Sequence, residues 1–179
     1  MSKFGRKVAA FLLASAVAVS TVVPSFAANS PVSGNGDSNT TVSGIVQQDK
    51  TVAVDNVNSS SDTATIPASF KVKDTNYAVS EIKSGTIKDK YKRVTLILNS
   101  STQVKPQIAM SKKAKKTKKI VIKAADGQKV AASQFSKKAF KGFKGKIVVK
   151  KSAMTKKQFK KLVKKLRKGG FKGKISRVK

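Results

Sequence analysis

The sequence predicts an α/β repeat fold: a short solenoid with a β-hairpin cap at its N-terminal end and an amphipathic capping helix at its C-terminal end. Three observations lead to this prediction. Apolar and polar residues alternate on both sides of a turn signal near residue 74, short β-branched runs recur at nearly constant spacing, and one segment has the apolar period of a helix. Such a repeat buries its apolar face only by stacking on its neighbours, so we expect one continuous ladder.

The chain begins with the pattern of a secretory signal peptide, predicted over residues 1–27. Three basic residues precede a sixteen-residue apolar run at 8–23, and small residues follow at the positions where a signal peptidase cleaves. A retained membrane anchor is the alternative, but this run is shorter than the ~20 residues that cross a bilayer. We therefore expect a secreted protein, extracellular or associated with the cell envelope.

Residues 28–63 are predicted to be a flexible, low-complexity spacer. The segment is rich in Ser, Thr, Asn and Gly, and it has few large apolar residues and no aromatic one. Its net charge is about −3, because four aspartates face a single lysine, Lys50. It would serve as a tether or, alternatively, fold back loosely on the basic region that follows.

Residues 64–179 are predicted to form the repeat domain, which opens with a hairpin. Ile66, Phe70 and Val72 alternate with polar neighbours, residues 73–76 supply a turn, and an extended pattern resumes at Tyr77. β-Branched runs then begin 26, 27 and 28 residues apart, at residues 94–98, 120–122, 147–149 and 175–178. We expect these four runs to pair as successive strands of a parallel sheet, although a lysine-rich alphabet could produce similar spacing by chance.

A C-terminal helix is predicted to begin after Thr155. Thr155 is an N-cap candidate, and Gln158 at the third helical position would complete a capping box. An apolar stripe follows, and Gly169 with Gly170 ends the helix; the stripe comprises Phe159, Leu162, Val163 and Leu166. The helix would cap the open end of the ladder or, alternatively, lie on a membrane surface, because its polar face is almost purely cationic.

With these pieces in place, residues 64–179 resemble the BspA-type leucine-rich-repeat proteins of bacterial surfaces, in particular the lysine-rich form of Gram-positive anaerobes. The matching segments are residues 64–67, 77–82, 137–142 and 147–178. The sequence departs from the family where Thr86-Ile87 and Ala109-Met110 replace Ala-Phe pairs and where Thr117 replaces a leucine. The resemblance implies a leucine-rich-repeat solenoid and a secreted or surface interaction protein, with adhesins among its members.

The sequence offers no catalytic, cofactor-binding or metal-binding set. It contains no His and no Cys, which removes the usual general base near neutral pH, the thiolate nucleophile and the commonest metal ligands. The carboxylates of the repeat region are scattered, without the close pair that glycosidases need. We therefore predict that the protein is not an enzyme and has no cofactor and no small-molecule substrate.

The charge of the C-terminal half is the main functional signal. Between Lys90 and Lys179 the chain has 31 lysines and arginines against one acidic residue, Asp126. Such a surplus predicts contact with polyanions. The candidate contact residues form two clusters: Lys112, Lys113, Lys115, Lys116, Lys118 and Lys119 in the first, and Lys156, Lys157, Lys160, Lys161, Lys164 and Lys165 in the second.

The expected partner is an anionic cell-wall polymer, or a host glycan or matrix protein, bound by an adhesin-like surface protein. Three alternatives stay open. The charge would serve only solubility, or the protein would bind extracellular nucleic acid, which predicts a steep salt dependence. In the third, the basic helix would act on membranes.

Overall fold

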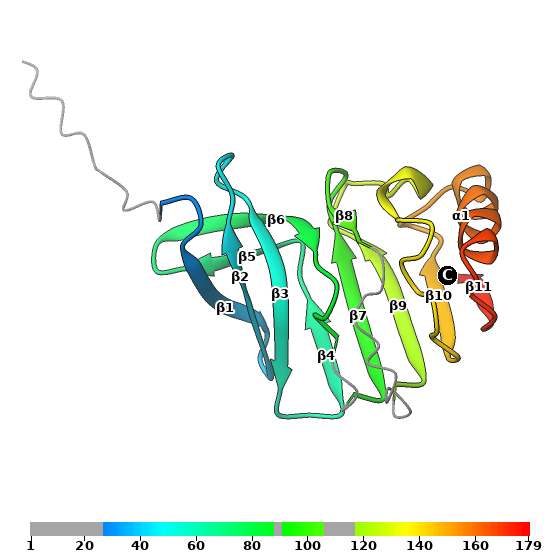
Figure 1. The fold of residues 1–179 in the computed structure, drawn as a ribbon, viewed down its shortest axis with the longest axis horizontal. Helices are drawn as coiled ribbons and strands as arrows, with labels where there is room; N and C mark the ends of the chain where they lie inside the picture. The colour runs from blue at the N-terminus through cyan, green and yellow to red at the C-terminus, as the bar shows by residue number, and fades with distance from the viewer. Residues whose placement is uncertain (1–26, 88–90, 106–116) are drawn as a thin grey trace, which may run out of the picture.

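The computed structural model describes residues 27–87, 91–105 and 117–179, which form two β-sheets, one α-helix and one short 3-10 helix (Figure 1). The first sheet has the strand order β1-β2-β3-β6-β5, with β8 also paired to β6. Its strands are β1 (Pro31–Asp37), β2 (Thr40–Val46), β3 (Val52–Ser59), β5 (Ser69–Val72), β6 (Thr75–Ile82) and β8 (Gln103–Val104). The second sheet, in the order β11-β10-β9-β7-β4, lies beside it.

The first sheet curls into a nearly closed, barrel-like shape of mixed strand direction. Antiparallel pairs join β1 to β2, β2 to β3 and β5 to β6, whereas β3 and β6 are parallel. The barrel nearly closes where β1 meets β5, because Gly34 allows the two backbones to approach. A Cβ atom at Gly34 would lie only 2.7 Å from the Lys71 carbonyl oxygen, so a larger residue would push these strands apart.

The predicted flexible spacer is wrong, because residues 31–59 form three strands of this sheet. Single valines alternate with Ser, Thr and Asn there, and the valines face inward: Val42 and Val54 are fully buried. Aspartates close the turns, since Asp37 accepts a hydrogen bond from the Asn39 N–H at 3.0 Å. The composition of this segment is that of a linker, but its period of two is that of a half-buried strand.

The second sheet is parallel throughout, and it contains the four predicted runs as neighbouring strands. These are β7 (Arg93–Leu98), β9 (Lys119–Ala124), β10 (Lys146–Lys150) and β11 (Ile175–Val178). Val94 pairs with Ile120, Ile120 with Ile147, and Ile147 with Ile175, so the predicted stacking of the runs is confirmed. A fifth strand, β4 (Thr63–Ile66), extends the ladder beyond β7.

The predicted leucine-rich-repeat solenoid is nevertheless wrong. The hairpin of β5 and β6 forms as predicted, but it belongs to the barrel-like sheet and does not cap the ladder. In a solenoid each repeat contacts only its neighbours. Here Asn99, directly after β7, donates hydrogen bonds to the Val79 carbonyl of β6, in the other sheet, and to the Ala68 carbonyl just before β5. The fold is therefore mostly β, a barrel-like sheet joined to a parallel sheet with one helix.

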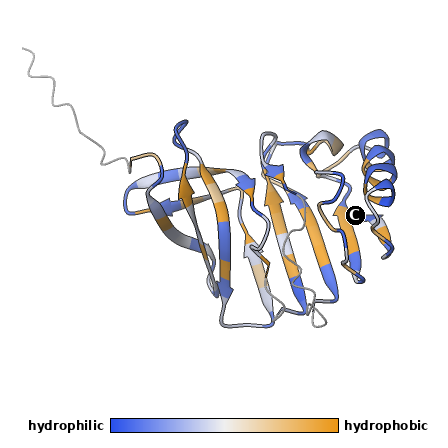
Figure 2. Ribbon diagram, in the orientation of Figure 1, coloured by the Kyte–Doolittle hydropathy of each residue, from blue (hydrophilic) through white to orange (hydrophobic). Residues whose placement is uncertain are grey.

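One apolar cluster runs through both sheets and reaches the helix α1 (Lys156–Lys168). Figure 2 shows apolar residues along the strands of both sheets and a largely hydrophilic outer surface on α1. The helix prediction is confirmed: Leu162 and Leu166 are fully buried, and the Thr155 side chain accepts from the Gln158 N–H. The Gln158 side chain does not complete the capping box but accepts instead from the Ala132 N–H, in the 3-10 helix Ala132–Gln134.

Candidate functional site

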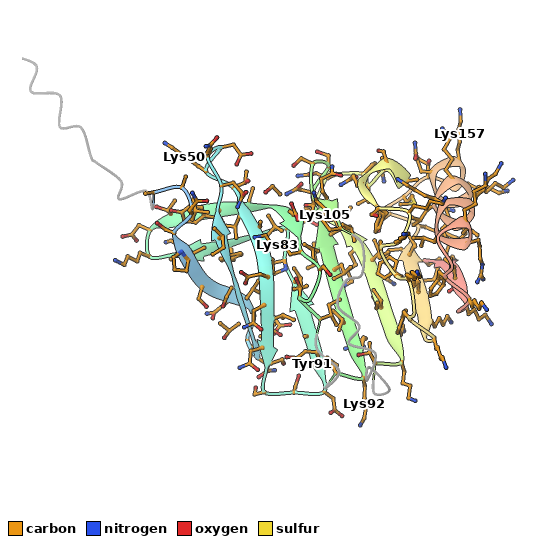
Figure 3. All side chains as sticks on the ribbon, viewed as in Figure 1. Lys50, Lys83, Tyr91, Lys92, Lys105 and Lys157 are labelled. Carbon is orange, nitrogen blue, oxygen red and sulfur yellow. The ribbon has the colours of Figure 1, made fainter. Side chains whose placement is uncertain are left out.

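Charge is distributed unevenly along the chain and therefore between the two sheets. Residues 27–87, which build most of the barrel-like sheet, contain four lysines and six carboxylates. Residues 117–179, which build β9 to β11 and α1, contain 23 lysines and arginines and one carboxylate, Asp126. Side chains that end in nitrogen accordingly crowd the β10, β11 and α1 side of the molecule (Figure 3). The molecule therefore has one nearly neutral end and one strongly positive end.

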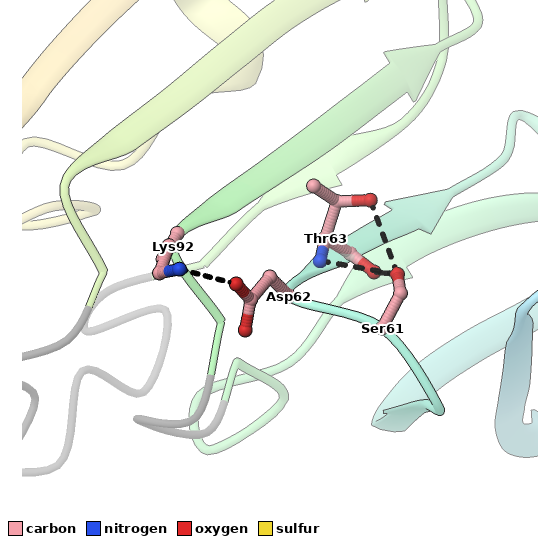
Figure 4. Close-up of polar contacts among 4 residues, drawn as sticks. All are labelled: Ser61, Asp62, Thr63 and Lys92. Atoms are coloured by element: carbon pink, nitrogen blue, oxygen red, sulfur yellow. Dashed lines mark hydrogen bonds and ion pairs between the residues drawn. The ribbon is translucent and has the colours of Figure 1, made fainter.

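Among the described residues, carboxylates pair with cations in the first sheet and at the starts of β4 and β7, the part of the second sheet that is farthest from α1. The three ion pairs found in the described ranges are Lys71 with Asp74, Lys92 with Asp62, and Lys105 with Glu81. None of them includes a cation of residues 117–179. The pair at the start of β7 is close enough that its hydrogen bond and the charge of Asp62 raise the pKa of Lys92 (Figure 4). From β9 onward the positive charges have no aspartate or glutamate partner within the described part of the chain, although Lys150 donates a hydrogen bond to the Lys179 oxygen at 2.5 Å.

Several of these cations instead stabilise the fold through backbone carbonyls. The Arg177 guanidinium donates to the Met154 carbonyl at 3.0 Å, and Arg167 donates to the Phe171 carbonyl at 2.9 Å while lying over the Phe171 ring. Lys165 donates to the Ala132 and Ser133 carbonyls at 3.2 Å. These side chains hold the helix and its connections, so the cations available to a ligand are mainly lysines.

The structure separates the predicted contact residues into two places. Lys118 and Lys119 lie at the start of β9, whereas the second cluster lies on α1. On α1, five of the six predicted lysines are exposed, and Lys165 is half-buried by its contacts with the carbonyls. Four further predicted residues, Lys112, Lys113, Lys115 and Lys116, lie outside the described residues. The two described groups do not form one site.

The sequence prediction missed a row of cations that the parallel sheet assembles. Arg93 is the register partner of Lys119, and Lys119 is the partner of Lys146. Lys174 continues the row, because it directly precedes Ile175, which pairs with Ile147. We call Arg93, Lys119, Lys146 and Lys174 the strand-start row; Lys118, Lys144 and Lys172 flank it in the preceding turns. A repeated tetrapeptide, Phe-Lys-Gly-Lys at residues 143–146 and 171–174, is the signal that would have revealed it.

The same tetrapeptide explains why the strand starts align. Phe143 and Phe171 are buried and stack with ring centroids 6.1 Å apart. A Cβ atom at Gly145 would lie 2.7 Å from the Lys118 carbonyl, and one at Gly173 would lie 2.2 Å from the Gly145 carbonyl. Glycine therefore allows each turn to stack closely on the previous one, and this keeps the lysines of successive strands in register.

The row lies on the face of the sheet that points away from the main apolar cluster; in it Arg93, Lys146 and Lys174 are exposed and Lys119 is half-buried. Along β7, Val94, Leu96 and Leu98 are fully buried, so Arg93 belongs to the opposite face, together with its register partners. Neighbouring strands are ~4.8 Å apart, and two unit charges at that distance in water repel by about 0.9 kcal/mol before salt screening. Repulsion of this size along four strands attracts counterions. The row can thus hold a chain of anions laid across the strands.

Other features of the described chain offer little chemistry. A polar cavity of about 280 Å³ lies at the opposite, nearly neutral end of the molecule, lined by Asn, Ser and Thr side chains and by Asp37. The described residues contain no group of three or more acidic residues that would hold a metal ion. Among them, no helix has the length and apolar character needed to cross a membrane.

Comparisons of the chain with protein-family models, with curated proteins and with solved structures find no match.

Proposed function

We propose that this protein is a secreted, non-enzymatic interaction protein of the cell surface, adhesin-like, whose basic C-terminal half binds anionic polymers. One observation carries the proposal: residues 117–179 hold 23 cations that have no aspartate or glutamate partner within the described ranges, while the other sheet is nearly neutral. If the charge only kept the protein soluble, a surface that mixes positive and negative residues would do so equally well and would avoid the self-repulsion. The uneven distribution favours an external anion.

The proposed partner is an anionic cell-wall polymer, with an acidic host glycan or a host matrix protein as the alternative. Secretion is inferred from the signal-peptide pattern of residues 1–27, which brings the chain to such polymers. Lysine supplies nearly all of the positive charge. Its ammonium group is a hydrated point charge, unlike the planar guanidinium group of arginine, which can donate two parallel hydrogen bonds to one anion. The resemblance to BspA-type proteins stays a prediction, and the proposal does not depend on it.

Two alternatives from the sequence have less support. A membrane-active helix would need a free apolar face, but Leu162 and Leu166 of α1 are fully buried in the core. Single-stranded nucleic acid is usually bound by stacking on exposed aromatic rings, yet Phe135, Phe140 and Phe143 are buried. Electrostatic attachment to a flexible polymer requires neither feature.

The test is to bind the secreted protein to intact cell walls of the organism that produces it and to elute it with increasing salt. We expect the protein to bind at low salt and to be released well below 1 M NaCl, where the Debye length falls to ~3 Å. A cell-wall preparation stripped of its anionic polymers is the control and should retain little protein. Retention at about 1 M NaCl, or equal binding to stripped walls, would contradict an electrostatic attachment.

A further inference from the structure

We infer that the strand-start row is the contact surface for the polymer, and that its ligand is a linear polyol-phosphate chain that lies across the strands. This inference rests on the proposed function and specifies both the site and the chemical class of its ligand. The row and its flanking lysines offer about two cations per strand at the starts of β9, β10 and β11. They are Lys118, Lys119, Lys144, Lys146, Lys172 and Lys174.

The geometry of the row favours an extended chain. Its members come from separate strands but share one register position, so the spacing between them is the strand spacing of ~4.8 Å. From Arg93 to Lys174 the row covers three such intervals, about 14 Å. A flexible chain that carries one anion per monomer can therefore place several anions against the row at once.

The lysines of α1 are arranged differently. Successive helical residues are rotated by ~100°, so Lys156, Lys157, Lys160, Lys161 and Lys164 fan over roughly 140° of the helix surface. An extended chain can meet only part of that arc at a time. The charges of the row can therefore contact one extended chain together, whereas those of the helix cannot.

The chemistry of the row favours phosphodiester groups over bulkier anions. The row contains three lysines and one arginine, which suits compact point anions better than planar carboxylates. The aromatic residues that precede these strands, Tyr91, Phe143 and Phe171, are buried, so neither bases nor sugar rings find a stacking surface there. A polymer of small polyols and phosphates needs only charge at regular spacing.

A carboxylate beside the β7 end of the row limits the extent of the site. At the start of β4, beyond β7, Asp62 pairs with Lys92, and Thr63 is the register partner of Arg93. The positive row therefore ends at the boundary with the nearly neutral sheet. A bound polymer would extend from β7 toward β11, away from the carboxylates of the first sheet.

The experiment compares two triple variants of the full secreted chain with equal loss of charge. The first removes three members of the row: Lys119→Gln, Lys146→Gln and Lys174→Gln. The second removes three exposed lysines of α1 as a matched control: Lys157→Gln, Lys161→Gln and Lys164→Gln. Binding of deacylated poly(glycerol phosphate) is measured by calorimetry at several NaCl concentrations, with heparin and single-stranded DNA of equal charge as comparison ligands. Circular dichroism verifies that both variants keep the fold.

We expect the row variant to lose about tenfold in affinity and about 2 units of the log–log salt slope, as three released counterions predict, and the control to lose less than about threefold. Equal losses in both variants would refute the row as the contact surface and leave the proposed function standing. Heparin or DNA bound as tightly, with the same dependence on the row, would refute the polyol-phosphate assignment. Absence of binding of the unmodified chain to all three polymers would refute the proposed function itself.

Discussion

Tyr91 offers the sharpest test of how the two sheets are joined. It lies just before β7 in the parallel sheet and is fully buried. Its hydroxyl accepts a hydrogen bond from the Ser59 N–H and donates one to the Val57 carbonyl, both at 3.0 Å, at the end of β3 in the barrel-like sheet. Tyr91→Phe removes the hydroxyl and keeps the ring, so it leaves these two backbone groups without that partner.

The expected cost follows from these two contacts. A buried polar group that loses its partner costs about 1 to 3 kcal/mol, so two such groups cost about 2 to 4 kcal/mol after partial relaxation. For a chain of this size, 1 kcal/mol lowers the melting temperature by about 2 to 4 °C, so we expect a fall of about 4 to 16 °C.

Urea unfolding followed by far-ultraviolet circular dichroism measures this difference. Thr95→Val is the matched control, because it removes a hydroxyl from the half-buried face of β7 and should change the free energy of unfolding by less than about 0.5 kcal/mol. A similarly small effect for Tyr91→Phe would refute the contact that we assign to it. Two separate transitions in the variant would show instead that the hydroxyl couples the sheets into one cooperative unit.

Three further predictions test the core and the turns. Thr117→Val should raise the free energy of unfolding by about 1 kcal/mol, because the Thr117 hydroxyl is buried without a hydrogen-bond partner among the described residues. A lower denaturation midpoint would contradict this. Leu166→Ala should cost about 2 to 5 kcal/mol in the same assay, whereas a cost under 1 kcal/mol would mean that α1 is not packed on the core. Burial raises the pKa of Asp37, but hydrogen bonds from Thr65 and Thr40 outweigh it, so the net pKa is lowered. The stabilisation by this carboxylate is therefore present above pH ~4 and lost as the pH falls further. The difference in free energy of unfolding between the unmodified chain and Asp37→Asn should shrink between pH ~4 and ~2, and a difference that does not change with pH would contradict this.

The parallel ladder was predictable because its signal is local and repeated. Each run begins with β-branched residues such as Ile120 and Ile147, and the near-constant spacing gives the pairing register directly. The α1 helix was predictable for a similar reason: Thr155 begins it, Gly169 ends it, and its apolar stripe has the helical period. In these segments local propensity and tertiary packing favour the same structure.

The barrel-like sheet was not predictable by the same route. Its first three strands contain no aromatic residue, and their core positions are single valines such as Val42 and Val54. Composition therefore suggested a linker, and only the alternation along each strand contained the signal. The closure of β1 on β5 depends on the absence of a side chain at Gly34, a tertiary contact that no local pattern encodes.

The candidate site was only partly visible for a related reason. Runs of adjacent lysines are conspicuous in a sequence, so the prediction favoured Lys118 and Lys119 and the face of α1. The strand-start row joins residues 26 to 28 positions apart, and its charge density exists only once the strands pair. The repeated Phe-Lys-Gly-Lys tetrapeptide is the local sequence signal of the row, because Lys146 and Lys174 occupy the same position in the two copies.

The row connects binding to stability. Like charges directly across neighbouring strands are destabilising, and here folding itself brings Lys119 and Lys146 together. At the start of β7 the carboxylate of Asp62 neutralises Lys92, but in the described chain no aspartate or glutamate does so at the starts of β9, β10 or β11. An anion bound to the row therefore binds the folded state and adds to its free energy of unfolding by linkage.

Salt separates the two effects. Moderate salt screens the repulsion within the row and should raise the melting temperature of the free protein, while the same salt competes with the polymer and should lower its affinity. Thermal unfolding of the free chain and polymer binding, both measured between about 0.02 and 0.3 M NaCl, should therefore change in opposite directions. The row variant, which lacks three of the repelling charges, should show a smaller change in both. If the melting temperature of the free chain did not depend on salt, the repulsion would already be relieved within the molecule, and an external anion would not be needed.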